Sequence, residues 1–449
     1  AMLLSTAEVS LALRGTTRRL EALDCALDAA GLAQEAGDVK MEALAMITAM
    51  SVNQQKKDFK AARRASLRAA GLFKALGDKR NEAIAYYALS AADINSGDWE
   101  QGMRCKTKAL TLFLEVGDRR MAGATWISQA EWLLEKDDSV GATEAAQNAL
   151  AIFEEIEDVE EGVGTAFGLI VQAHIMNSQP IKGLVIAEDG LAKARALGNK
   201  MEEVRYLHVM VEALLAAKKH DRALVVAQEA TTLCQDLDDR RSETMAWETL
   251  AHLHFRSGQW AAARDASRKS VDVAKSLDGF EEGAFHRMEF LSRVLVQMDE
   301  YSEAVKVMQE AKRLAQSIDE QYLEAKALMG LCCAHAVHGD VDKAYSAGRL
   351  SAELFSKEGY TRGEAEAWRA MADVFVDLDY KVSLRAAKEA ERISEEFGDK
   401  RMLLRVKASL AAIQAWHSHW DEVAEEASQG LKIARLLDDA KGRVEMIFL

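Results

Sequence analysis

Apolar residues along this chain recur at the spacing of amphipathic helices, and the helices come in pairs. Between residues 78 and 117, apolar positions return every three or four residues, which places them on one helix face; they are Ile84, Ala85, Ala88, Leu89 and Ala92. A polar turn at residues 95–98 interrupts the pattern, and a second amphipathic stretch begins at Trp99. Each stretch predicts a helix of roughly 17 residues, roughly 25 Å long.

The turn that ends each helix pair returns about every 40 residues, a period typical of stacked helical repeats. Its acidic or Gly-containing positions run through the whole chain: Gly37-Asp38, Gly77-Asp78, Gly117-Asp118, Glu157-Asp158, Gly198-Asn199, Asp238-Asp239, Asp278-Gly279, Ile318-Asp319, Gly359-Tyr360, Gly398-Asp399 and Asp438-Asp439. Asp at such a turn can cap the N-terminus of the next helix, and Gly suits a left-handed end of the previous one. The fold predicted is all-α, a solenoid of antiparallel helix pairs.

Small residues separated by seven positions mark the second helix of nearly every pair. The pairs are Ala22/Ala29, Ala62/Ala69, Gly102/Ala109, Ala142/Ala149, Gly183/Gly190, Ala223/Ala230, Ala263/Ser270, Ala304/Ala311, Ala344/Ser351, Ser383/Ala390 and Val423/Gly430. Positions i and i+7 share one helix face, and small side chains there let neighbouring helices approach closely. Only Val423 departs from the pattern, which therefore predicts helix-on-helix stacking along the whole chain.

We expect one solenoid over residues 1–449 with about 11 helix pairs. Residues 1–37 would be a partial N-terminal pair, residues 38–438 ten repeats, and residues 439–449 the start of a further helix. Because both ends fall within a pair and the last residues are apolar, we expect a segment of a longer chain. The alternative is a terminal helix that folds back.

These features resemble the tetratricopeptide repeat (TPR) superfamily. The resemblance lies in the small-residue pairs, in the turn Gly97-Asp98-Trp99 and in its variants before Trp260, Tyr301 and Tyr380. The first helices add aromatic matches at Tyr86, Trp126, Trp247 and Trp368, large apolar matches at Leu89, Leu169, Met210, Leu250, Phe290, Met371 and Leu410, and small matches at Ser90, Ala130, Ala251, Ala372 and Ala411. The resemblance implies a right-handed superhelix.

The repeat is longer than the family's usual 34 residues and lacks its terminal Pro. This long variety is similar to the repeats of kinesin light chains, of spindle-orientation adaptors and of the sensor arms of bacterial signalling and transcription proteins. The resemblance is specific for the fold rather than for the function.

Composition and charge narrow the classes of partner. Hydrophobic residues make up 49% and charged residues 29%, which is typical of a folded chain, and the net charge of -15 disfavours nucleic-acid binding. No apolar run approaches the length of a membrane span. The five cysteines form no paired or metal-finger spacing and favour a reducing, intracellular compartment, the cytoplasm first.

A cluster of basic residues stands out against this acidic background. It consists of Lys56, Lys57, Lys60, Arg63, Arg64 and Arg68. Such a cluster is most simply a solvated helix face; the alternative is a docking patch for an acidic partner.

Signatures of catalysis and of cofactor binding are absent from the sequence, including the phosphate-cradling and dinucleotide-binding glycine motifs. One group could hold a metal, because its members lie three apart on a helix: Cys332, Cys333, His335 and His338. Buried cysteines beside a helix end are the alternative, and we favour it. We therefore expect neither an enzyme, nor a cofactor, nor a metal site.

The resemblance implies that the first helices of the pairs line a concave groove. Candidate groove residues carried over from it are Tyr87, Glu131, Phe167, His208, Glu212, Glu248, His252, Phe255, Arg369 and Asp373. They are apolar with scattered acids and histidines, which favours an extended peptide or a helix of a protein partner. At each position, packing against a neighbouring repeat is the competing interpretation.

The sequence therefore predicts a non-catalytic scaffold or adaptor that binds protein partners, or a permanent subunit of a large assembly. It predicts no nucleic-acid partner and no membrane insertion. The alternative is a ligand-sensing or autoinhibitory arm of a multidomain signalling protein or transcription regulator.

Overall fold

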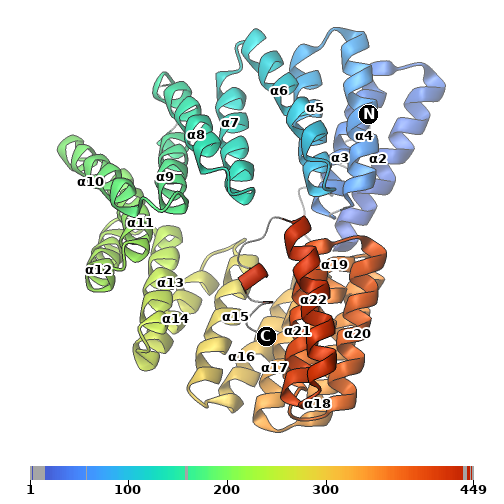
Figure 1. Cartoon of the computed structure of the whole chain (residues 1–449). Coiled ribbons are helices and arrows are strands. Elements are labelled where there is room, and N and C mark those ends of the chain that lie inside the picture. The colour runs from blue at the N-terminus through green and yellow to red at the C-terminus, as the bar shows by residue number, and fades with distance from the viewer. Residues whose placement is uncertain are drawn as a thin grey trace. The chain divides into compact units, whose positions relative to one another are not determined.

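The computed structural model describes residues 3, 16–56, 58–156, 160–437, 442–444 and 446. The regular secondary structure in these ranges is helical. Within these ranges there is no strand. The chain divides into two compact units, Ala1–Leu253 and His254–Leu449. Each unit is a series of antiparallel helix pairs (Figure 1), as the sequence predicts.

The first unit begins with the second helix of a pair and continues through complete pairs. Its helices are α2 (Thr16–Ala36), α3 (Val39–Gln55), α4 (Phe59–Leu76), α5 (Lys79–Asn95), α6 (Trp99–Glu115), α7 (Arg119–Glu135), α8 (Ser139–Glu154), α9 (Glu160–Met176), α10 (Pro180–Leu197), α11 (Lys200–Ala216) and α12 (His220–Asp236). Helix α13 (Arg240–Arg256) crosses the boundary between the units.

The second unit repeats the same arrangement. Its helices are α14 (Trp260–Lys275), α15 (Glu281–Gln297), α16 (Tyr301–Ser317), α17 (Gln321–His338), α18 (Val341–Lys357), α19 (Thr361–Val374), α20 (Tyr380–Phe397), α21 (Lys400–Trp416) and α22 (Trp420–Leu436). Odd-numbered helices are the first helices of the pairs, and even-numbered helices are the second.

Several of the acidic turns cap the helices that follow them, whereas those before α15, α17 and α19 make no side-chain cap. The side chains of Asp38, Asp78 and Asp118 each accept a hydrogen bond from the backbone N–H three residues later, at the start of a first helix. The second helices α4, α6 and α8 are capped in the same way by Asp58, Asp98 and Asp138. Each cap satisfies an N–H group that the helix leaves unpaired. The predicted turns at Glu157-Asp158 and Asp438-Asp439 lie outside the described residues.

The first helices also contact one another within each unit. In the first unit α9 packs against both α7 and α11, and in the second α15, α17, α19 and α21 follow in contact. Second helices are joined mainly to the first helix before and after them. Within each unit, the first helices of neighbouring repeats therefore lie side by side in one layer. A groove along a repeat protein is lined by such a layer.

The small residues that the sequence singled out lie at the contacts between helices. Ala62, Ala142, Ala223, Ala304 and Ala344 are all fully buried. Their role is clearest at Gly190 on α10, where an added Cβ would lie 2.6 Å from Cε1 of Tyr206 and 2.9 Å from Cζ of Phe167. Val423, the exception in the sequence pattern, is also buried, at 5% exposure.

This packing predicts that a Gly→Ala substitution changes the free energy of unfolding in opposite directions at Gly190 and Gly71. Gly190→Ala should lower the free energy of unfolding by about 1–3 kcal/mol, because the two rings must move to admit the methyl group. Gly71→Ala on α4 should raise it by up to about 1 kcal/mol, because no atom lies within 4 Å of the new Cβ and Ala favours the helix. Urea unfolding of both variants checks this; stabilisation by both would contradict the packing.

Near the C-terminus, residues 442–444 are helical and Met446 is buried at 3% exposure. Met446 packs with Leu404 of α21 and Ala434 of α22. The remaining residues of the predicted further helix, and most of residues 1–15, lie outside the described residues.

Candidate interaction surfaces

The predicted groove residues of the first unit lie on first helices, and the two aromatic ones are half-buried in contacts with other helices. Phe167 on α9 is half-buried, and its ring lies edge-to-face on Tyr206 of α11, with 4.7 Å between the ring centroids. Tyr87 on α5 is half-buried against the cluster that contains Ala109 and Phe113 of α6. Both aromatic side chains contribute to packing between neighbouring helices.

Polar groove candidates in this unit divide into exposed and half-buried side chains. Glu131, Glu212 and His252 are exposed at equivalent positions on α7, α11 and α13, whereas His208 and Glu248 are half-buried. Burial lowers the pKa of His208, whose Nε2 has no hydrogen-bond partner among the described residues. Desolvation raises the pKa of the Glu212 carboxyl even though part of its side chain is at the surface.

In the second unit, the predicted groove residues pack on or pair with other residues of the same unit. Phe255 packs edge-to-face on Trp260 and on Phe290, with ring centroids 5.0 and 5.7 Å apart. Arg369 forms ion pairs with Glu366, at 2.8 Å, and with Asp373. These contacts favour packing over ligand contact at the three positions.

A buried lysine that the sequence does not single out lies in the first unit. Lys106 on α6 is fully buried, and its Nζ has no hydrogen-bond partner among the described residues. The amine lies 3.5 Å from the ring centroid of Trp132 on α7. Burial lowers the pKa of Lys106 to about 6. The negative charge of the nearby Glu131 carboxylate acts in the opposite direction and raises the pKa, but by less.

A second buried lysine has the opposite surroundings. Lys407 on α21 is 4% exposed, and its amine pairs with Glu426 of α22 at 2.8 Å and with Glu391 of α20. It also donates a hydrogen bond to the side-chain oxygen of Gln429. Burial alone would lower the pKa of Lys407, but the hydrogen bonds to the two carboxylates outweigh it and raise the pKa. Lys407 thus joins three helices.

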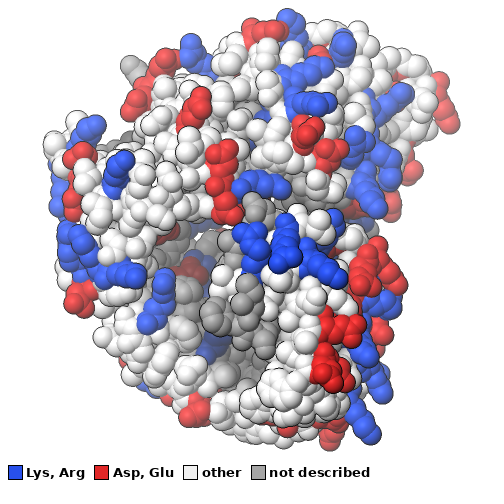
Figure 2. Space-filling model, in the orientation of Figure 1, with Lys and Arg blue, Asp and Glu red and all other residues white. Residues whose placement is uncertain are grey.

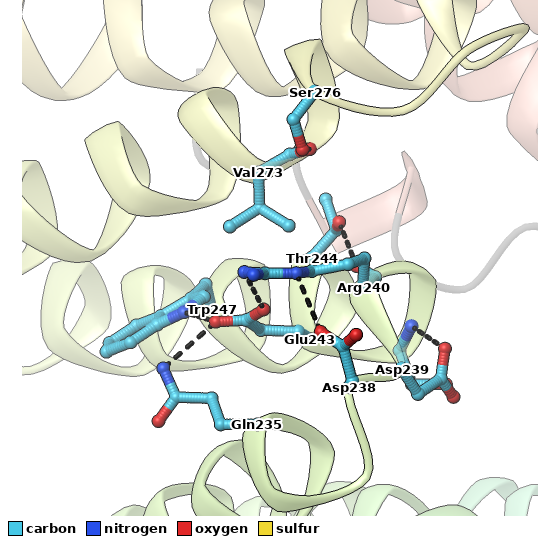
Figure 3. A network of polar contacts seen from close by, with 10 residues as sticks. Gln235, Asp238, Asp239, Arg240, Glu243, Thr244, Trp247, Val273 and Ser276 are labelled. Atoms are coloured by element: carbon cyan, nitrogen blue, oxygen red, sulfur yellow. Dashed lines mark hydrogen bonds and ion pairs between the residues drawn. The ribbon is translucent and has the colours of Figure 1, made fainter.

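Buried carboxylates near the start of first helices form a further group that the sequence pattern does not reveal. Figure 3 shows one of them, Glu243 on α13, which accepts hydrogen bonds from Gln235 at 2.9 Å, from Trp247 at 3.2 Å and from Arg240 at 3.2 Å. Arg240 also pairs with Asp238 at 3.2 Å. Buried acids recur near the same place on other first helices: Glu42, Glu82 and Glu203. They hold the start of the helix to its neighbours.

The basic cluster lies on and beside α4. Arg63 pairs with Asp93 of α5 at 2.5 Å, and Arg68 pairs with Glu42 of α3 at 2.6 Å. Lys60 and Arg64 are exposed and form no ion pair with a described residue, Lys56 is half-buried at the end of α3, and Lys57 lies outside the described residues. Lys74, further along α4, is exposed in the same way.

We define the α4 basic face as Lys60, Arg64 and Lys74 together with the 44% exposed Leu67. Their spacing places them on one side of the helix. Figure 2 shows Lys and Arg side chains gathered over this region of the first unit. Helix α4 contains no acidic residue, so nothing along the helix itself neutralises this face.

The cysteine and histidine candidates for a metal do not converge. Cys332 lies against Gly348 of α18, whereas Cys333 lies near Asp373 of α19. His335 and His338 each have Nδ1 3.4 Å from Oδ2 of Asp340. Burial raises the pKa of the Cys332 thiol to about 12. Across the described part of the chain, no three His, Cys, Asp or Glu residues gather in a way that could hold a metal ion.

A membrane span would need a longer and more apolar helix than any found among the described residues.

Comparison with known proteins identifies similar structures only. No protein-family model matches the chain, and no curated protein matches its sequence. The apo form of RapI is 12% identical with a TM-score of 0.48, covering 72% of this chain and 95% of RapI. A STAND signal transduction ATPase with a tetratricopeptide repeat sensor, from Pyrococcus horikoshii, is 14% identical with a TM-score of 0.47, covering 80% of this chain and 53% of that protein.

A third similar structure contains the TPR-like repeats of a putative kinesin light chain from Podosopora anserina. It is 15% identical with a TM-score of 0.39, covering 43% of this chain and 95% of that one. Support for the architecture comes from this chain itself: its helix pairs, their period and the close contacts at their small residues. The described residues thus form an all-α helical-repeat fold of antiparallel helix pairs.

Proposed function

We propose that this chain is a non-catalytic scaffold that binds protein partners on the exposed faces of its helix pairs. The single observation that carries the proposal is the α4 basic face. In a chain of net charge -15, α4 has five basic residues and no acidic one. Two of its arginines are paired within the unit, and Lys60, Arg64 and Lys74 remain exposed without an ion pair to a described residue. An acidic protein segment is the partner that this face would attract.

The first-helix layer is a second region for partners under this proposal. Its exposed side chains in the first unit are Glu131, Glu212 and His252, which would contact an extended segment along successive repeats. The other candidates of the first unit are half-buried and would support that surface: Tyr87, Phe167, His208 and Glu248. The candidates of the second unit would act within their own unit, where they pack or pair: Phe255, Arg369 and Asp373. We infer no catalytic role for any of these residues.

Charge reversal on α4 should abolish binding of an acidic segment. The probe is a fluorescein-labelled, glutamate-rich peptide, and the variant carries Lys60→Glu, Arg64→Glu and Lys74→Glu. Because opposite charges face the peptide in the wild type, we expect the variant to bind at least about tenfold more weakly by fluorescence anisotropy. The wild-type affinity should fall as salt is raised.

A matched variant separates the α4 basic face from the total charge. Lys182, Lys193 and Lys219 are exposed lysines of the same unit, on or beside α10 and α12. Changing all three to Glu alters the net charge equally and should leave the affinity near the wild-type value, apart from a small general repulsion. Equal weakening by both triple variants would refute a specific acidic-partner site on α4.

A further inference from the structure

Three exposed polar side chains form a row across the first-helix layer of the first unit. Glu131 on α7, Gln172 on α9 and Glu212 on α11 each lie twelve residues after the first residue of their helix. Helix α9 packs against both α7 and α11, so the three positions follow one another across neighbouring helices (Figure 1). None of the three side chains forms a hydrogen bond or an ion pair with a described residue. We call them the Glu–Gln–Glu row.

Two basic groups lie beside the carboxylates of this row, and burial keeps both of them largely uncharged at pH 7. Lys106 lies near Glu131, and its pKa is about 6. His208 lies one helical turn before Glu212, and burial lowers the pKa of its imidazole below the usual value. The pKa of each carboxyl is accordingly raised, by desolvation first. A cation from outside the unit would therefore give both carboxylates a pairing that these neighbours do not supply.

The spacing of the row selects the form of a segment that can pair with both carboxylates. Packed helices lie about 8–10 Å apart, so α7 and α11 are separated by roughly 16–20 Å across α9. A polyproline II segment rises about 3.1 Å per residue with three residues per turn, so its first, fourth and seventh residues face the same way and advance by about 9 Å each. This advance matches the helix spacing. The fourth residue would meet Gln172, whose amide can both donate to and accept from the backbone of the segment.

We propose that the Glu–Gln–Glu row binds an extended protein segment with Lys or Arg at its first and seventh positions and an uncharged residue at the fourth. Each basic side chain pairs with one glutamate, and the amide of Gln172 hydrogen-bonds the backbone between them. The inference rests on the proposed scaffold function and gives its second region a partner chemistry. The row attracts a basic segment, whereas the α4 basic face attracts an acidic one, so the two can fail separately.

The experiment uses the full chain and three short, fluorescein-labelled, proline-rich peptides. One carries two arginines six positions apart, one carries the same arginines two positions apart, and one carries Gln in place of both. We expect the first peptide to bind about tenfold or more tightly than the other two by fluorescence anisotropy, because only the six-residue spacing reaches both carboxylates. Glu131→Gln combined with Glu212→Gln should abolish this preference.

Matched variants separate the row from general attraction to an acidic chain. Glu35→Gln combined with Glu144→Gln makes the same chemical change at two exposed positions of the same unit, on α2 and α8, and should leave the preference intact. Gln172→Ala should weaken binding of the six-spaced peptide about threefold or more, because the backbone loses its partner. The α4 charge-reversal variant should bind this peptide no less tightly than the wild type.

Three results would overturn the inference. One is equal binding, or no binding, of the two arginine peptides to the wild type. Another is equal weakening by the two pairs of Glu→Gln substitutions. The third is a wild-type dimer in sedimentation that Glu131→Gln and Glu212→Gln dissociate, because the occupant would then be a second copy of this chain. If the acidic peptide still binds the α4 basic face, the scaffold proposal stands and only the row is excluded.

Discussion

Replacing Lys407 with methionine should destabilise the second unit by about 3 kcal/mol, because it leaves two half-buried carboxylates without their buried cation. Glu391 and Glu426 have side chains that are 21% and 20% exposed, and both pair with the Lys407 amine. The loss should appear as faster hydrogen exchange in α20, α21 and α22, with α14 and α15 much less affected, since each repeat contacts mainly its neighbours.

A compensating variant tests the cause. Lys407→Met combined with Glu391→Gln and Glu426→Gln removes the unpaired charges, so it should recover part of the lost stability. If Lys407→Met alone leaves the exchange of these helices unchanged, the buried ion pairs do not hold them together.

Replacing Lys106 with methionine should have the opposite effect and stabilise the first unit by about 3 kcal/mol at pH 7. The pKa of Lys106 is about 6 in the folded chain, against 10.5 for a free lysine. Between these values the unfolded chain binds a proton that the folded chain does not, and this favours unfolding. Methionine fills a similar volume beside Trp132 and carries no such penalty.

The pH dependence gives this prediction a second readout. The penalty is largest below about pH 6 and fades as the pH rises toward 10.5, so the advantage of the methionine variant should shrink between pH 7 and pH 9. Urea unfolding at the two pH values measures it. Lys182→Met, at an exposed position on α10, should change stability by less than about 0.5 kcal/mol at either pH. Destabilisation by Lys106→Met, or a gain independent of pH, would contradict the account.

The features that the sequence predicts well depend on residues close together in the chain. A cap needs only Asp78 and the N–H group of Asn81, and a small-residue face needs only two positions seven apart. These local rules determine the helix pairs and their period. The helix pairs therefore follow from the sequence in the part of the chain that the structure describes, whereas side-chain caps form at only some of the predicted turns.

The candidate sites depend on contacts between repeats, which a single sequence does not reveal. Lys106 and Lys407 are the same residue type on amphipathic helices, yet one faces an indole ring and the other two carboxylates. Phe167 and Phe255 fit the groove pattern but pack on rings of neighbouring helices.

The most direct test of the scaffold proposal is affinity purification of the full chain from native lysate at physiological salt, followed by quantitative mass spectrometry. The account predicts a set of protein partners in stoichiometric amounts that survives washing, with at least one acidic partner lost in the α4 charge-reversal variant. Recovery of a bound small molecule and no stoichiometric protein would contradict it, and would favour a ligand-sensing arm.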